Sequence, residues 1–206
     1  MSNDLGCVKL QKIERSELAT TQWTEAGIVL VWEDHLTAHG QGCWSAVGQA
    51  SGFGWTSTTY GSASATGAPD NYQVVALDSS CDGLGQATLE HEILHALGVD
   101  HEHNRPDRDN YLTINLSASI SPDQYEKQAW DRHMQSNYPF ELDSVMTYCS
   151  FCSAANPNVP VAFLHPQYSL NGEQIFSDGA KMTTTDALQI QYKYCQAKGT
   201  WEIFKQ

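Results

Sequence analysis

The residues best suited to chemistry lie between His91 and His101, in the pattern His-Glu-x-x-His-x-x-Gly-x-x-His. Residues four positions apart lie on the same face of an α-helix, so His91 and His95 can direct their imidazoles at one metal ion. Zinc takes nitrogen, oxygen or sulfur ligands in a tetrahedral arrangement, and a catalytic zinc site keeps one position for water. The pattern therefore predicts two zinc ligands on a helix and requires a third ligand from outside that helix.

His101 is the candidate for the third ligand. It follows His95 by six residues, too far along the chain to share one helix face with the pair. Gly98 lies between them and can adopt the left-handed backbone that ends a helix and turns the chain back. Glu92 lies beside the pair and is placed to accept a proton from water that attacks a carbonyl group. The pattern predicts one Zn²⁺ per chain on His91, His95 and His101, with Glu92 as the general base.

Two simpler interpretations explain less of the pattern. A surface helix with two solvated histidines would explain His91 and His95, but it leaves Gly98 and His101 unexplained. A structural zinc site fits poorly, because such sites are closed and usually rich in thiolates. Nothing in the spacing recruits His103, and we expect a solvated or hydrogen-bonded loop histidine there.

Residues 91–111 closely resemble the active-site signature of the astacin family of metzincin zinc endopeptidases, in which Glu and an Arg-x-Asp-Arg-Asp-x-Tyr run follow the third histidine. Residues 144–148, Ser-Val-Met-Thr-Tyr, resemble the family's Met-turn. The resemblance implies that Met146 underlies the metal site and that Tyr148 is catalytic, supporting the oxyanion of the transition state through its phenol. On spacing alone, Met146 would be an ordinary core methionine and Tyr148 an ordinary half-buried phenol.

The resemblance also implies the fold class, which is α+β. We expect a metzincin-like zinc peptidase with a twisted mixed sheet and the active-site helix in an N-terminal lobe, and an irregular C-terminal lobe that ends in a helix. One catalytic domain would cover residues 1–206, with an upper lobe over 1–98 and a lower lobe over 99–206 that carries the third histidine and the Met-turn. Family domains have a strand and a long helix before the cysteine matched by Cys7, so the domain is expected to be short at its N-terminus.

Local patterns predict the elements of the first half. Residues 7–13 alternate apolar and polar side chains, and residues 27–32 form a continuous apolar run; both patterns are typical of strands. Residues 42–48 resemble the family's edge strand at the substrate cleft, and residues 72–77 read as a further strand. The stretch 51–71, rich in small residues with three aromatic ones, is either a flexible surface loop or a lid that contacts substrate.

The second half is predicted to contain less regular structure. Residues 111–116 are strand-like, and Ser-Pro-Asp at 121–123 is typical of a helix start, from which we expect a helix to about His133. We expect mostly irregular chain over 157–178 and a C-terminal helix over 185–194. Thr88 is a candidate N-cap for the helix of the first motif.

Six cysteines, an even number in an acidic chain with a zinc-peptidase pattern, suggest an oxidising compartment. The resemblance implies two disulfides and leaves the last two cysteines for each other, giving the pairs Cys7 with Cys195, Cys43 with Cys81, and Cys149 with Cys152. A second metal site or a redox pair is the alternative for the third pair. We expect a secreted or extracellular protein whose signal and propeptide are not present in this chain.

Composition limits the partners. The formal net charge of −13, from 11 basic and 24 acidic residues, argues against nucleic acid as a partner. No run of 18 apolar residues exists that could span a membrane. The sequence carries no signal of oligomeric state. The function that results is a zinc-dependent endopeptidase, hydrolysing peptide bonds of extended protein or peptide substrates with metal-activated water. The alternative is a catalytically inactive or fragmentary homologue that serves as a zinc- or protein-binding module, although such a module would not need Glu92.

Overall fold

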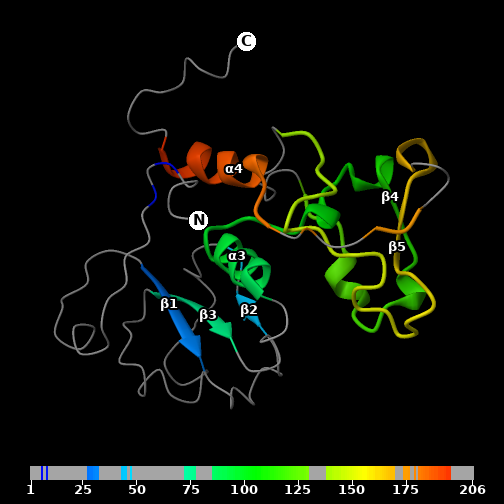
Figure 1. Cartoon of the computed structure of the whole chain (residues 1–206), viewed down its shortest axis with the longest axis horizontal. Coiled ribbons are helices and arrows are strands. Elements are labelled where there is room, and N and C mark those ends of the chain that lie inside the picture. Colours follow the sequence, from blue (N-terminus) through cyan, green and yellow to red (C-terminus); the bar gives the residue numbers. More distant parts are fainter. Residues whose placement is uncertain are drawn as a thin grey trace, which may run out of the picture. The chain divides into compact units, whose positions relative to one another are not determined.

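The structure is a computed structural model that describes Gly6, Val8 and residues 27–32, 43–45, 47, 72–77, 85–129, 138–169, 174–176, 179 and 181–195 (Figure 1). The chain divides into two compact units, residues 1–98 and 99–206. None of the helices in the described part has the length and hydrophobicity that crossing a bilayer requires.

The first unit contains a three-stranded mixed sheet with the strand order β1-β3-β2. Strand β1 (Gly27–Trp32) runs parallel to β3 (Tyr72–Leu77), with Gly27 opposite Tyr72 and Trp32 opposite Leu77. Strand β2 (Trp44–Ser45) pairs with β3 in the antiparallel direction. The sequences of β1 and β3 are rich in β-branched and aromatic residues, which favour extended backbone. The mixed sheet and the α+β class predicted from the sequence are confirmed.

Helix α3 (Gly85–Ala96) packs against β2 and β3 and carries the first motif. Gly85, the first residue of the helix, has φ 71°, a left-handed backbone conformation that only glycine adopts without strain. The prediction that Thr88 caps this helix is wrong, because Thr88 lies within it. Leu94 of the helix and Val75 of β3 are fully buried, so the helix contributes an apolar side chain to the core of this unit.

The second unit consists of short elements. Strand β4 (Leu112–Ile114) pairs antiparallel with β5 (Ala162–Leu164). The strand predicted over 111–116 is therefore confirmed in a shorter form, whereas β5 lies in a segment predicted to be mostly irregular, where three residues are too few to show a period. The 3₁₀ turns of this unit are η2 (Glu102–Asn104), η3 (Arg108–Asn110), η4 (Leu116–Ala118), η5 (Pro122–Tyr125) and η7 (Pro166–Tyr168).

The helix predicted from Ser121 to about His133 is wrong over the described residues, which contain only the four-residue turn η5 and leave it in extended backbone at Glu126. In an α-helix, the carbonyl of Gln124 would accept the N–H of Gln128. Here Gln128 N–H donates to the Asn104 carbonyl at 2.7 Å, and the Gln124 carbonyl accepts Asn104 Nδ2 at 2.8 Å. The donor and the acceptor of that helical bond are thus both bonded to Asn104 instead. These tertiary hydrogen bonds outweigh the helix-start signal at residues 121–123.

Helix α4 (Thr184–Cys195) confirms the predicted C-terminal helix. Its start is fixed by a reciprocal pair: Asp186 N–H donates to Thr183 Oγ1 at 3.1 Å, and Thr183 N–H donates to Asp186 Oδ2 at 2.9 Å. This arrangement is a capping box, which satisfies backbone donors that the first turn leaves without partners. Ala187 and Ile190 form the buried apolar face of α4.

The pairing of Cys149 with Cys152 as a disulfide is confirmed. Cys43 and Cys195 are also disulfide-bonded. Their predicted partners, Cys81 and Cys7, lie outside the described residues, so those two pairings stay predictions. The strand predicted over 7–13 and the loop or lid predicted over 51–71 also lie outside them.

Arg108→Lys should lower the free energy of unfolding by about 2–3 kcal/mol, because Arg108 is buried and its Nη1 donates to the carbonyls of His103 and Tyr125. A lysine ammonium is more strongly hydrated than a guanidinium and so costs more to bury, and it lacks the Nε donor that bonds Asp109 at 3.1 Å. Urea unfolding monitored by circular dichroism measures the change.

The matched control is Lys127→Ala, which removes an exposed ion pair with Asp109 and should cost about 0–1 kcal/mol. Equal losses in the two variants would show that the buried guanidinium does not hold these turns.

Candidate metal centre

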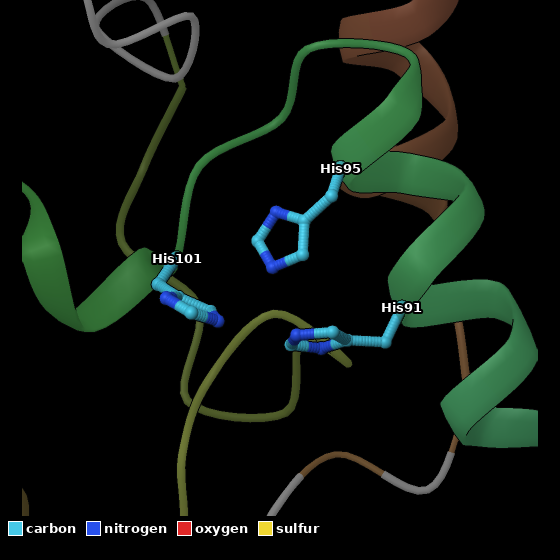
Figure 2. Close-up of side chains that lie close together, drawn as sticks. All are labelled: His91, His95 and His101. Atoms are coloured by element: carbon cyan, nitrogen blue, oxygen red, sulfur yellow. The ribbon is translucent and has the colours of Figure 1, made fainter. Parts of the chain in front are cut away.

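Three imidazoles converge at the end of α3. His91 and His95 occupy successive turns of the helix, and their ring centroids lie 4.5 Å apart. The nitrogen atoms that His91, His95 and His101 offer all lie within 4.8 Å of one another. Figure 2 shows the three rings turned toward one another, two from the helix and one from the segment that follows it. The structure therefore brings together all three metal ligands predicted from the sequence.

The end of α3 explains how His101 reaches the pair. Leu97 N–H still donates to the Ile93 carbonyl, but Gly98 N–H donates to the carbonyl of His95 at 2.8 Å, which tightens the last turn. Gly98 has φ 93°, a backbone conformation that other residues rarely adopt. The chain then leaves the helix axis, as the glycine in the pattern predicts.

A second contact orients the ring of His101. Its Nδ1 lies 3.2 Å from Oδ1 of Asn104. When Nδ1 carries the proton and donates to this oxygen, Nε2 is left as the metal-binding atom. Asn104 was not predicted as a site residue, although an amide three residues after the third histidine is a signal that could have pointed to it.

The donor set fits zinc. Three imidazoles within reach of one ion are a ligand set of catalytic zinc sites, which keep their remaining position for water. Glu92 gives an independent indication, because its Oε2 is buried and has no hydrogen-bond partner in the described part of the chain. Such an acceptor calls for a donor, and a water molecule at the metal would supply one.

The carboxyl group of Glu92 has a raised pKa. Burial raises its pKa to about 8, and a hydrogen bond from the backbone of Ser45 in β2 opposes that rise. A group with a pKa near neutrality can both accept and return a proton, and the charge of a bound zinc ion would favour its ionised form. Ser45 is a further residue that the sequence analysis did not single out.

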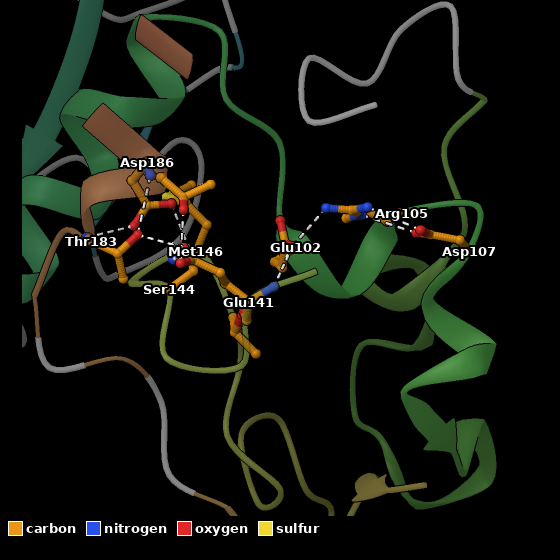
Figure 3. A network of polar contacts seen from close by, with 10 residues as sticks. Glu102, Arg105, Asp107, Glu141, Ser144, Met146, Thr183 and Asp186 are labelled. Atoms are coloured by element: carbon orange, nitrogen blue, oxygen red, sulfur yellow. Dashed lines mark hydrogen bonds and ion pairs between the residues drawn. The ribbon is translucent and has the colours of Figure 1, made fainter. Parts of the chain in front are cut away.

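Residues 144–148, the predicted Met-turn, are bonded directly to the segment that carries the third histidine. The carbonyl of Met146, a fully buried residue, accepts Glu102 N–H at 2.9 Å. Ser144 Oγ accepts Met146 N–H at 3.0 Å and donates to Asp186 Oδ1 at 2.7 Å. Figure 3 shows how these bonds connect the turn to the start of α4. The capping carboxylate of α4 therefore also holds the Met-turn.

Glu102 forms the other end of this network (Figure 3). Its side chain is 2% exposed, and its Oε1 accepts Arg105 Nη1 at 3.0 Å and the backbone N–H of Glu141 at 2.8 Å. Burial raises the pKa of Glu102 to about 7, against the lowering effect of Arg105. Arg105 also binds both carboxylate oxygens of Asp107, at 3.0 and 2.9 Å. A buried carboxylate with such partners fixes the chain immediately after His101.

Tyr148 lies against the third histidine. Its ring centroid is 4.5 Å from that of His101 and 4.4 Å from that of His103. Of the two expectations for His103, the hydrogen-bonded one is met and the solvated one is wrong: the residue is 0% exposed. The spacing of the motif gave no signal for this burial.

Comparisons with known proteins identify the family. The family model for the astacin peptidases matches residues 53–195. The zinc metalloproteinase nas-11 of Caenorhabditis elegans is 34% identical over 143 residues, which cover 68% of this chain and 24% of that protein. Meprin A subunit alpha of Mus musculus is 36% identical over 90 residues, which cover 43% of this chain and 12% of that protein.

A solved structure is similar in fold. High choriolytic enzyme 1, a hatching enzyme zinc-protease from Oryzias latipes, superposes with a TM-score of 0.57 at 20% sequence identity, covering 82% of this chain and 68% of that one. The curated relatives are much longer: the chain spans about a quarter of nas-11 and of nas-9, at 24% and 28% of their lengths.

Gly98→Ala should weaken zinc binding by about tenfold, because alanine resists φ 93° and any relaxation displaces His101. Isothermal titration with Zn²⁺, or competition with a chromogenic chelator, measures the affinity.

Gly85→Ala is the matched control, since it also places an alanine where the backbone φ is positive, at 71°. The added Cβ meets nothing within 4 Å there. Both variants should lose about 1–3 kcal/mol of stability, but only Gly98→Ala should lose zinc affinity. Unchanged zinc affinity in Gly98→Ala would contradict the role of the turn.

Proposed function

The chain belongs to the astacin family, and on that basis we propose that it is a zinc-dependent endopeptidase acting on extended protein or peptide segments. The observation that carries the proposal is the convergence of three imidazoles within 4.8 Å, next in sequence to a buried carboxyl group that lacks a partner among the described residues. A module that only bound metal would not need such a carboxyl group.

His91, His95 and His101 are the proposed ligands of one zinc ion. When bound, zinc polarises the carbonyl of the scissile bond and lowers the pKa of water at the site. Glu92 accepts the proton of the attacking water and returns it to the leaving amine, as its raised pKa allows. Tyr148, whose ring lies against His101, donates a hydrogen bond from its phenol to the oxyanion.

The proposed substrate lies along β2. The backbone of Ser45 in this strand bonds the carboxyl group of Glu92, so a peptide extended beside β2 would pass the general base. Backbone pairing with a strand holds a peptide in register with little dependence on its side chains. This supports extended proteins and peptides as the substrate class.

The wider organisation follows from the same resemblance. We propose that residues 1–206 form one catalytic domain, with residues 1–98 as its upper lobe and 99–206 as its lower lobe. The Cys149–Cys152 disulfide, with disulfide-bonded Cys43 and Cys195, supports a secreted or extracellular location, because structural disulfides persist in oxidising compartments.

Glu92→Gln should lower the rate of cleavage by about 10²–10⁴-fold while zinc content stays at one ion per chain, because the amide keeps the shape of the side chain but cannot accept the proton. Cleavage of a reduced and carboxymethylated protein, followed by gel electrophoresis and mass spectrometry, measures the rate. Atomic absorption measures the zinc.

The chelator-treated parent chain is the control for metal dependence, and added Zn²⁺ should restore its activity. A parent chain that holds zinc yet cleaves no substrate would contradict the proposal, as would a Glu92→Gln variant that cleaves at the parent rate.

A further inference from the structure

His103 is the one buried histidine of the motif region that the proposed mechanism does not use. It is 0% exposed, although it lies in the turn η2 and only two residues beyond His101. We propose that His103 is a positioning residue that holds the backbone of Tyr148 in place for oxyanion stabilisation. This inference rests on the proposed function, in which Tyr148 is the phenol donor, and it names the residue that positions Tyr148.

The hydrogen bonds of His103 specify one form of the ring. Tyr148 N–H donates to His103 Nδ1 at 3.2 Å, so Nδ1 must be without a proton. On the other side of the ring, Nε2 lies 3.2 Å from the carbonyl oxygen of Gln124, which requires a donor. Only the neutral imidazole with its proton on Nε2 satisfies both partners.

The ring of His103 also packs against the rings of His101, a proposed zinc ligand, and Tyr148, the proposed oxyanion donor. Its centroid lies 4.7 Å from that of His101, with the planes inclined at 22°, and 4.4 Å from that of Tyr148. Since the rings of His101 and Tyr148 are themselves 4.5 Å apart, the three rings form a closed set of contacts. In a close-packed interior, a displacement of one member is transmitted to the others.

His103 is also held by Tyr125 and Arg108. Tyr125, which is 0% exposed, lies 5.1 Å from His103 between ring centroids, and its hydroxyl donates to the Cys152 carbonyl at 2.6 Å. Arg108 Nη1 donates to the His103 carbonyl at 2.9 Å. Backbone and ring of His103 are therefore both fixed, which makes it a rigid reference for the Tyr148 backbone.

Two conservative variants separate the acceptor from the rest of the ring. The amide oxygen of His103→Asn takes the place of Nδ1 and can still accept Tyr148 N–H, whereas the amide nitrogen of His103→Gln takes the place of Nε2. The Gln124 carbonyl keeps a donor in either case, because Asn104 Nδ2 also bonds it at 2.8 Å. The two variants thus differ mainly in whether Tyr148 N–H keeps a partner.

We expect His103→Gln to lower kcat by about 100-fold and His103→Asn by at most about tenfold, with KM and zinc content little changed, since misplacing a catalytic group by about 1 Å costs that much. Equal losses in the two variants, or losses that follow zinc content, would overturn the proposal.

A double-mutant cycle supplies the second arm. Tyr148→Phe removes the phenolic donor, so in that background His103→Gln should change kcat by less than about twofold. Additive losses would show that His103 acts independently of Tyr148 and would overturn the proposal.

A third readout does not depend on activity. Amide hydrogen exchange at Tyr148 should be slow in the parent chain and in His103→Asn, and at least about tenfold faster in His103→Gln. If the parent chain proves inactive, the proposed function fails and this measurement still decides whether His103 holds Tyr148. Equal exchange rates in all three chains would refute the hydrogen bond itself.

Discussion

A straight α-helix can direct only two imidazoles at one metal ion, and this constraint governs the arrangement around the site. His91 and His95 take those two positions on α3, so the third ligand has to come from chain that has left the helix. Gly98, at φ 93°, makes the departure possible, and His101 arrives three residues later. The sequence of this turn is therefore as much a part of the metal site as the ligands are.

A ligand on a turn needs support from the chain around it, and in the described part of residues 99–206 a network of buried polar groups supplies it. Glu102, directly after His101, is fixed by the Met146 carbonyl, by Arg105 and by the backbone of Glu141. Removing one partner from such a buried network leaves a charge without compensation, which costs far more than the intact pair contributes. The turns η2 and η3 are held by such buried bonds: Arg105 donates to Glu102, and Arg108 donates to the carbonyls of His103 and Tyr125.

How much was predictable depends on how local the signal is. The convergence of the three histidines, the strands β1 and β3 and the helix α4 follow from motif spacing and local apolar patterns, and the structure contains all of them. The helix expected after Ser121 failed because Asn104, seventeen residues earlier, takes its hydrogen bonds. Two further features could not be predicted from the sequence: the burial of His103 and the hydrogen bond between Asp186 and Ser144. Each depends on a partner distant in sequence.

The most direct test of the central claim, that three imidazoles and water hold one zinc ion, is zinc K-edge X-ray absorption on the metal-loaded chain. The account predicts three histidine nitrogens at about 2.0–2.1 Å, an oxygen ligand in addition and no sulfur scattering. His101→Ala should reduce the number of imidazoles to two. Thiolate scattering near about 2.3 Å, or an unchanged imidazole count in that variant, would contradict the claim that the turn after α3 supplies the third ligand.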